Sequence, residues 1–169
     1  MAGQHTIKVT KYSDIEEEKV AAAIVTPGML LELTNANQVQ AHSVAGGNLL
    51  HRFALEDELQ GKGIDDNYAA NDQLKVWIPG RGDIVQAILA NDNDVDIGDY
   101  LESDGNGYLQ EHTADADSWD MPSPAGEIIV YPNQIVGQAL EAVDTSHDSS
   151  TESTGEPLGL GERILVRII

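Results

Sequence analysis

Residues 74–89 read LKVWIPGRGDIVQAIL, and this stretch decides the fold class. Two short apolar runs, Leu74–Ile78 and Ile84–Leu89, flank Pro79-Gly80-Arg81-Gly82, whose proline and glycines are typical of tight turns. Short runs rich in Val, Ile and Trp between turn residues predict β-strands. We therefore expect two strands here, with Trp77 in the core.

The same alternation of short apolar runs and turn residues continues on both sides. Residues Leu49–Leu59 fit either a strand or one or two helical turns. Regularly spaced short strands favour a mainly β fold, and we expect a compact small β-barrel or sandwich-like domain. Further strands are predicted at Met29–Leu33, Gln38–His42, Tyr100–Glu102, Tyr108–Gln110, Glu127–Tyr131, Ile135–Val143 and Arg163–Ile169.

The chain divides into an N-terminal arm with an acidic linker, residues 1–23, and a β-rich domain, residues 24–169. Ser13 or Asp14 can cap a helix over the acidic residues that follow, so the linker is expected to be a short helix or a charged connection. Two stretches rich in Asp, Ser, Thr and Pro, residues 113–125 and 144–161, are expected to be long acidic loops inserted between strands.

The charge balance is the strongest compositional signal. Nine Lys plus Arg against 29 Asp plus Glu give a net charge of −20, while 41% of the residues are hydrophobic. Enough apolar residues are present for a core, so the excess acid indicates an acidic surface rather than disorder. Such a surface repels nucleic acid and anionic lipid, and we expect neither nucleic acid nor membrane as a partner. High salt would screen its self-repulsion, so we interpret the surface as salt-adapted.

The sequence lacks three features: cysteine, a long apolar run and an apolar signal region. The absence of cysteine excludes disulfides, thiolate zinc sites and a cysteine nucleophile. No apolar run is long enough to span a bilayer, and the first residues contain no apolar signal region. We expect a soluble protein that acts where it is made.

The residues Asp92, Asp94 and Asp96 have nearly the spacing of a calcium loop. An EF-hand loop needs glycine at its sixth position and a bidentate glutamate at its twelfth, where this chain has Ile97 and Ser103. The flanking residues are also predicted strands rather than helices. We therefore expect no metal site and interpret these aspartates as turn residues, with Val95 and Ile97 pointing inward.

No arrangement typical of an enzyme stands out. The five histidines are scattered without an HExxH pattern, and the serines lie in no G-x-S-x-G turn. The glycines of GKGIDD, residues 61–66, lack the ending of a phosphate-binding loop. Carboxylates are too abundant for a catalytic pair to be selected. We expect no catalytic residues, no cofactor and no enzymatic activity.

Several runs resemble the capsid decoration proteins of tailed viruses, also called cement or head-stabilising proteins. The resemblance covers most of Thr26–Val143 and the terminal strand. It is carried by TPGMLLEL (26–33), ALEDELQGKGIDDNYAANDQLKVWIPGRGDIVQAIL (54–89), VDIGDYLESDGNGYLQ (95–110), VGQALEAVD (136–144) and RILVRII (163–169).

The resemblance implies a structural virion protein with a compact β fold. It further implies homotrimers at three-fold positions on the outer capsid surface, with the major capsid protein as partner. We expect the apolar terminal strand, Ile164–Ile169, to supply subunit contacts. The acidic composition would suit a virus of a halophilic archaeon.

Members of this family typically hold the capsid with an N-terminal arm. Here the segment Thr6–Tyr12 alternates, with Ile7 and Val9 on one face, and contains the basic residues Lys8 and Lys11. We predict that it adds a strand to a sheet edge of the capsid protein. An equally compatible alternative is a first strand of the protein's own sheet. The predicted capsid-binding residues are Thr6, Ile7, Lys8, Val9, Lys11 and Tyr12.

A biotinyl or lipoyl carrier domain is the alternative from another class. GDIVQAIL (82–89) followed by VDIGDYL (95–101) is faintly similar to the paired strands of such carriers. Carriers need an exposed lysine at a hairpin tip, and the turn Asn91–Asp94 contains none. A hydrolytic enzyme on a β scaffold is a third option, which inertness toward substrates would exclude.

Overall fold

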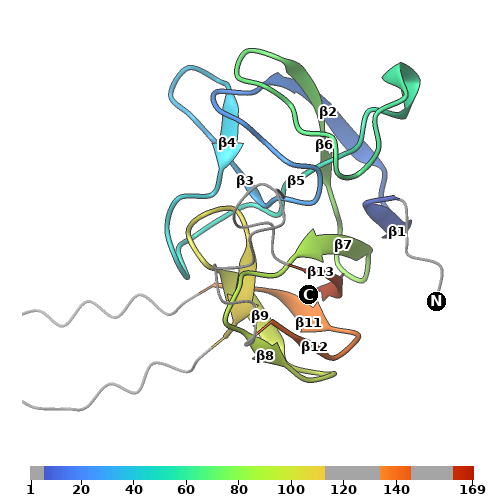
Figure 1. Ribbon diagram of the computed structural model, residues 1–169, viewed down its shortest axis with the longest axis vertical. Helices are drawn as coiled ribbons and strands as arrows, with labels where there is room; N and C mark the ends of the chain where they lie inside the picture. The colour runs from blue at the N-terminus through green and yellow to red at the C-terminus, as the bar shows by residue number, and fades with distance from the viewer. Residues whose placement is uncertain (1–5, 113–133, 146–161) are drawn as a thin grey trace, which may run out of the picture.

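The computed structural model describes residues 6–112, 134–145 and 162–169, which form a mainly β, sandwich-like domain (Figure 1). A short 3-10 helix, η1 (Glu58–Gln60), interrupts the strands. The predicted fold class is confirmed, as a sandwich-like domain whose described strands form no closed barrel. The strands are β1 (Lys8–Thr10), β2 (Ile15–Val20), β3 (Leu31–Leu33), β4 (Val39–Ala41), β5 (Phe53–Ala54), β6 (Gln73–Ile78), β7 (Ile84–Ile88), β8 (Asp94–Val95), β9 (Tyr100–Ser103), β10 (Leu109–Glu111), β11 (Ile135–Ala139), β12 (Val143–Asp144) and β13 (Arg163–Ile168).

The largest sheet has six antiparallel strands in the order β1-β7-β13-β11-β9-β10. Strand β7 therefore lies between β1 and β13, which come from opposite ends of the described chain. Its residues Val85 and Ala87 are fully buried. This strand holds the two ends of the chain together.

A second sheet has the order β2-β6-β5, and two further pairs, β3-β4 and β8-β12, complete the described strands. The strands predicted on either side of Pro79–Gly82 are confirmed as β6 and β7, but they belong to different sheets. The turn therefore carries the chain from one sheet to the other, and Gly82 adopts a φ of 93° that favours glycine. Figure 1 shows β2–β6 in the upper part of the molecule and β7–β13 in the lower part.

The sheet β2-β6-β5 has core on both faces because side chains alternate along a strand. On one face the fully buried Phe53 and Trp77 pack against the interior of the six-stranded sheet. On the other face Leu74 and Val76 join a second cluster with Leu31 of β3 and its neighbours. The predicted core position of Trp77 is confirmed.

The acidic linker is a strand, and the expected helix or charged connection is wrong. Strand β2 pairs with β6 from Ile15, opposite Ile78, to Val20, opposite Gln73. A single short helix is marginal in water, whereas pairing with β6 satisfies backbone groups along the whole segment. Glu16 and Glu18 remain exposed on this strand, so its acidity is compatible with an edge position.

Other predicted elements differ in detail. Leu49–Leu59 contains both a strand, β5, and a helical turn, η1, and Ile135–Val143 divides into β11 and the start of β12. The predicted strand Glu127–Tyr131, the loop 113–125 and residues 146–161 of the second loop lie outside the described residues. No helix in the described part of the chain has the length and apolarity needed to cross a bilayer.

Strand β13 does not have the role expected of the terminal residues. Ile164, Val166 and Ile168 are buried in the core of their own domain. These three side chains are therefore unavailable for contacts between subunits. The expectation that the terminal strand supplies such contacts is wrong for them.

We expect Gly137→Ala to destabilise the six-stranded sheet. A Cβ atom at Gly137 would lie 2.5 Å from Cγ1 of Val166 and 2.6 Å from the backbone oxygen of Arg167, so β11 and β13 would have to move apart. Overpacking of this kind costs about 1–3 kcal/mol, which denaturant unfolding measures. Gly63→Ala is the matched control, because a Cβ atom there meets only Asp66, at 3.8 Å. Equal losses in the two variants would contradict the prediction.

Candidate functional site

The predicted attachment segment, Thr6–Tyr12, is part of the folded domain. Strand β1 pairs with β7, with Lys8 opposite Val85 and Thr10 opposite Ile84. Ile7 is fully buried in the main core, and its carbonyl oxygen accepts a 2.9 Å hydrogen bond from the backbone N–H of Gln86. The segment is expected from its sequence either to add a strand to the capsid protein or to form a first strand of the protein's own sheet. In the structure it is a strand of the protein's own sheet.

Two buried carboxylates fix the segment at its ends. Glu56 accepts a hydrogen bond from the hydroxyl of Thr6 and one of 3.2 Å from the backbone N–H of Ile7. Asp83 is fully buried and accepts hydrogen bonds from the backbone N–H groups of Tyr12 and Gly80. Buried carboxylates need such partners, so both groups hold the segment in place. Sequence reasoning missed them because nothing distinguishes these two among 29 acidic residues.

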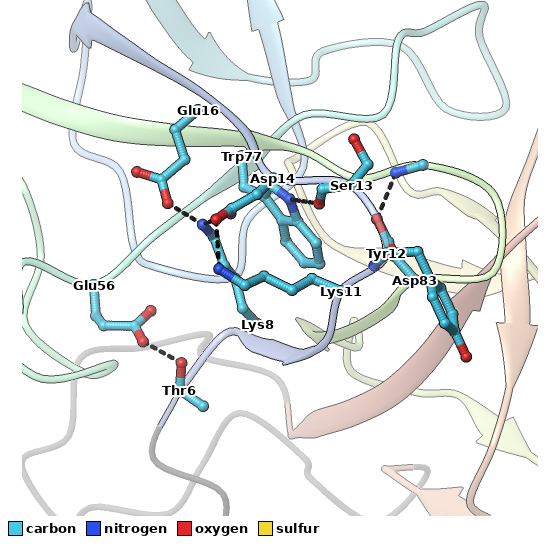
Figure 2. Close-up of polar contacts among 11 residues, drawn as sticks. Thr6, Lys8, Lys11, Tyr12, Ser13, Asp14, Glu16, Glu56, Trp77 and Asp83 are labelled. Atoms are coloured by element: carbon cyan, nitrogen blue, oxygen red, sulfur yellow. Dashed lines mark hydrogen bonds and ion pairs between the residues drawn. The ribbon is translucent and has the colours of Figure 1, made fainter.

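Lys8 is engaged within the protein (Figure 2). Its ammonium group pairs with Asp14 at 2.7 Å and with Glu16, and it lies 5.5 Å from the centroid of the Trp77 ring. The indole N–H of Trp77 donates to the backbone oxygen of Ser13 at 3.2 Å. The cluster ties β1 to β2 and β6, and the positive charge of Lys8 is neutralised locally.

The pKa shifts follow from these contacts. Partial burial opposes the charge on Lys8, but its hydrogen bonds to Asp14 and Glu16 outweigh burial and raise the pKa of Lys8 above the usual 10.5. Hydrogen bonds from Lys11 and Lys8 lower the pKa of Asp14 below the usual 3.8. The contribution of Asp14 to stability is therefore lost as the pH falls through its lowered pKa. The contribution of Lys8 is lost as the pH rises through its raised pKa.

The exposed part of the segment lies at its C-terminal end. The Tyr12 side chain is 81% exposed, and that of Lys11 is half exposed although it pairs with Asp14. Figure 2 shows Tyr12 directed away from the Lys8 cluster and from Glu56. Of the six predicted contact residues, Lys11 and Tyr12 are therefore the ones presented most fully to a partner, whereas Ile7 is not presented at all.

A hollow of about 250 Å³ borders the segment at Thr6 and Lys8. It is lined by both acidic and basic side chains, among them Lys8, Glu16, Glu58 and Lys75, with the exposed Leu59 at its rim. Lys8 already pairs with Glu16. The mixed charges give this hollow no clear preference for an anion or a cation.

The aspartates of the calcium-like stretch act in turns. Asp92 has a φ of 61°, and the Asp99 carboxylate accepts a 2.9 Å hydrogen bond from the backbone N–H of Asp96. Asp104 similarly closes the predicted hairpin between β9 and β10 by accepting from the N–H groups of Asn106 and Tyr108. Within the described residues no group of three or more His, Asp or Glu side chains is placed to hold a metal ion.

One residue of this stretch differs from its prediction. Val95 is buried as expected, but Ile97 is 70% exposed, so its predicted inward position is wrong. The strand β8 ends at Val95, and the alternation of a strand does not continue into the turn that follows.

A comparison with solved structures found one with a similar fold. The chain is similar to the N base of the head fibre gp8.5 of bacteriophage phi29, known from a crystal structure, with a TM-score of 0.53. The match covers 93% of this chain and 95% of that chain at 12% sequence identity. The two chains share a fold. No family model matches this chain, and no curated protein sequence matches it.

Proposed function

We propose that this chain is a structural protein of a virion, and that it binds the outer surface of the capsid as a decoration protein that stabilises the head. The main support is the fold shared with the base of a phage head fibre over 93% of this chain. The sequence runs that resemble decoration proteins support the same class. Binding of this kind needs an exposed contact surface and no catalytic centre.

The proposed partner is the major capsid protein, and the proposed contact includes the N-terminal segment. Because Ile7 is buried and β1 is already paired with β7, attachment uses the exposed residues Lys11 and Tyr12 rather than a free strand. The contact is then made by a preformed surface, which loses less conformational entropy on binding than a flexible arm does.

We propose that the protein is a homotrimer at three-fold positions of the capsid. Imaging of particles that carry and that lack the chain tests location and stoichiometry together. The expected result is density on the outer surface, at three-fold or quasi-three-fold positions, in the carrying particles alone. A chain absent from purified particles, or a monomer bound away from those positions, would contradict the proposal.

The net charge of −20 predicts a strong dependence of stability on salt. The melting temperature is expected to fall by several degrees as salt decreases from about 1 M to about 0.1 M, because the Debye length grows from about 3 Å to about 10 Å and self-repulsion increases. Thermal melts across this range measure the effect. Calcium added at fixed ionic strength is the control and is expected to change little. A salt-independent melting temperature would remove the support for a halophilic host.

A further inference from the structure

Three neighbouring strands bring distant parts of the sequence onto one face of the six-stranded sheet. Thr10 of β1 is opposite Ile84 of β7, and Ile84 is opposite Arg167 of β13. Directly opposed residues in antiparallel strands have side chains on the same face, and adjacent strands lie about 4.8 Å apart. Arg167 therefore lies two strands from the N-terminal segment, although the sequence separates them widely.

The turn before β7 completes this region. The backbone N–H of Gly82 donates to the carbonyl oxygen of Ile168 at 2.8 Å, which places the turn beside the end of β13. A Cβ atom at Gly82 would lie 3.7 Å from the ring of Tyr12. Arg81 precedes this glycine in the chain, and Ile169 follows Ile168, the residue whose carbonyl oxygen accepts from Gly82. We call the surface formed by Lys11, Tyr12, Arg81, Arg167 and Ile169 the basic end.

The arginines of the basic end are available to a partner. Both Arg81 and Arg167 are exposed, and neither forms an ion pair with any residue in the described ranges. The adjacent Asp83 is buried and accepts hydrogen bonds from the backbone N–H groups of Tyr12 and Gly80 rather than from either arginine. Tyr12 and Ile169, which is 41% exposed, add apolar area between the charges.

We infer that the basic end is a single composite attachment surface and that its partner is an acidic protein surface. This inference rests on the function proposed above. Arginine and tyrosine are enriched at protein interfaces, and a guanidinium binds carboxylates in a bidentate manner. The long-range repulsion of a chain with a net charge of −20 disfavours a nucleic acid as the occupant. The basic end thus offers local attraction where two acidic surfaces meet, and salt strengthens the contact by screening the remaining repulsion.

Charge reversal of the two arginines tests this surface. The variant R81E/R167E is compared with K19E/K62E, which has the same net charge but changes lysines of β2 and of the turn after η1. Binding is measured by co-sedimentation with capsids that lack the chain, and circular dichroism checks that each variant is folded. R81E/R167E is expected to bind about 100-fold more weakly or worse, because like charges placed together cost several kcal/mol. K19E/K62E is expected to bind as the wild type does. R81K/R167K keeps both charges but loses the bidentate geometry, so its affinity is expected to lie between those of the wild type and R81E/R167E.

Each contrary result has a distinct meaning. Equal binding by R81E/R167E and K19E/K62E would overturn the composite surface while leaving the decoration function in place. Failure of the wild type to bind capsids would overturn both. If R81E/R167E changes the oligomeric state of the free protein in sedimentation velocity, the occupant is a second copy of this chain, and the acidic capsid partner is wrong. A duplex DNA oligonucleotide retained by the wild type and lost by R81E/R167E would assign the surface to nucleic acid instead.

Discussion

Deletion of residues 1–12 is expected to unfold the domain rather than to leave a stable core without its attachment segment. Ile7 is fully buried in the main core, and replacing such a residue by alanine alone costs about 2–5 kcal/mol. The deletion also removes β1 from β7 and leaves the buried Glu56 without Thr6 and Ile7. These losses approach the roughly 5–15 kcal/mol that stabilises a typical domain.

Circular dichroism and thermal unfolding of the truncated chain measure this effect. Two single variants serve as internal references. Ile7→Ala is expected to lose about 2–5 kcal/mol, whereas Tyr12→Ala is expected to lose little, because the Tyr12 side chain is 81% exposed. A truncated chain that melts like the full-length protein would restore the flexible arm that the sequence pattern also allowed.

Trp77→Ala is expected to lower the free energy of unfolding by about 3–5 kcal/mol, a large loss for a single substitution. The ring is fully buried, its N–H donates to Ser13, and Lys8 lies over its face. Removal would therefore open the core beneath the N-terminal segment and release the contact between β1 and β6. Denaturant unfolding gives the change in free energy.

Trp77→Phe separates these contributions. It keeps an aromatic ring in the core but removes the hydrogen bond to Ser13, which contributes about 1 kcal/mol, and some of the indole volume. We expect Trp77→Phe to be clearly more stable than Trp77→Ala. If the two variants were equally destabilised, the hydrogen bond rather than core packing would explain the role of Trp77.

Local pattern predicts most strands but not their partners. The runs Leu74–Ile78 and Ile84–Leu89 match β6 and β7 almost to the residue, because alternation and turn residues are local signals. Their assignment to different sheets depends on which distant strands they meet. The acidic segment Ser13–Ala23 escapes prediction for the same reason, since its partner β6 lies far along the chain. Residues outside a strand, such as Ile97, also escape the alternation rule.

The candidate site is predictable in part. The scarcity of basic residues draws attention to Lys8 and Lys11, but whether a lysine is already paired depends on the fold, and Lys8 is held by Asp14 and Glu16. Arg81 and Arg167 could not be connected with this segment from sequence. The register of β1, β7 and β13 places Arg167, and the hydrogen bond from Gly82 to Ile168 places the turn that contains Arg81.

The position of β7 between β1 and β13 has a consequence for biosynthesis. As the chain leaves the ribosome, β7 can pair with β1 early, but its other edge stays open until residues 163–168 have emerged. The six-stranded sheet therefore cannot close until these residues have emerged, about 75 residues after β7 itself. Sheets that depend on such distant pairings form slowly, and their open edges are exposed to aggregation meanwhile. The high negative charge then keeps unfinished chains apart while they wait for the strand that completes them.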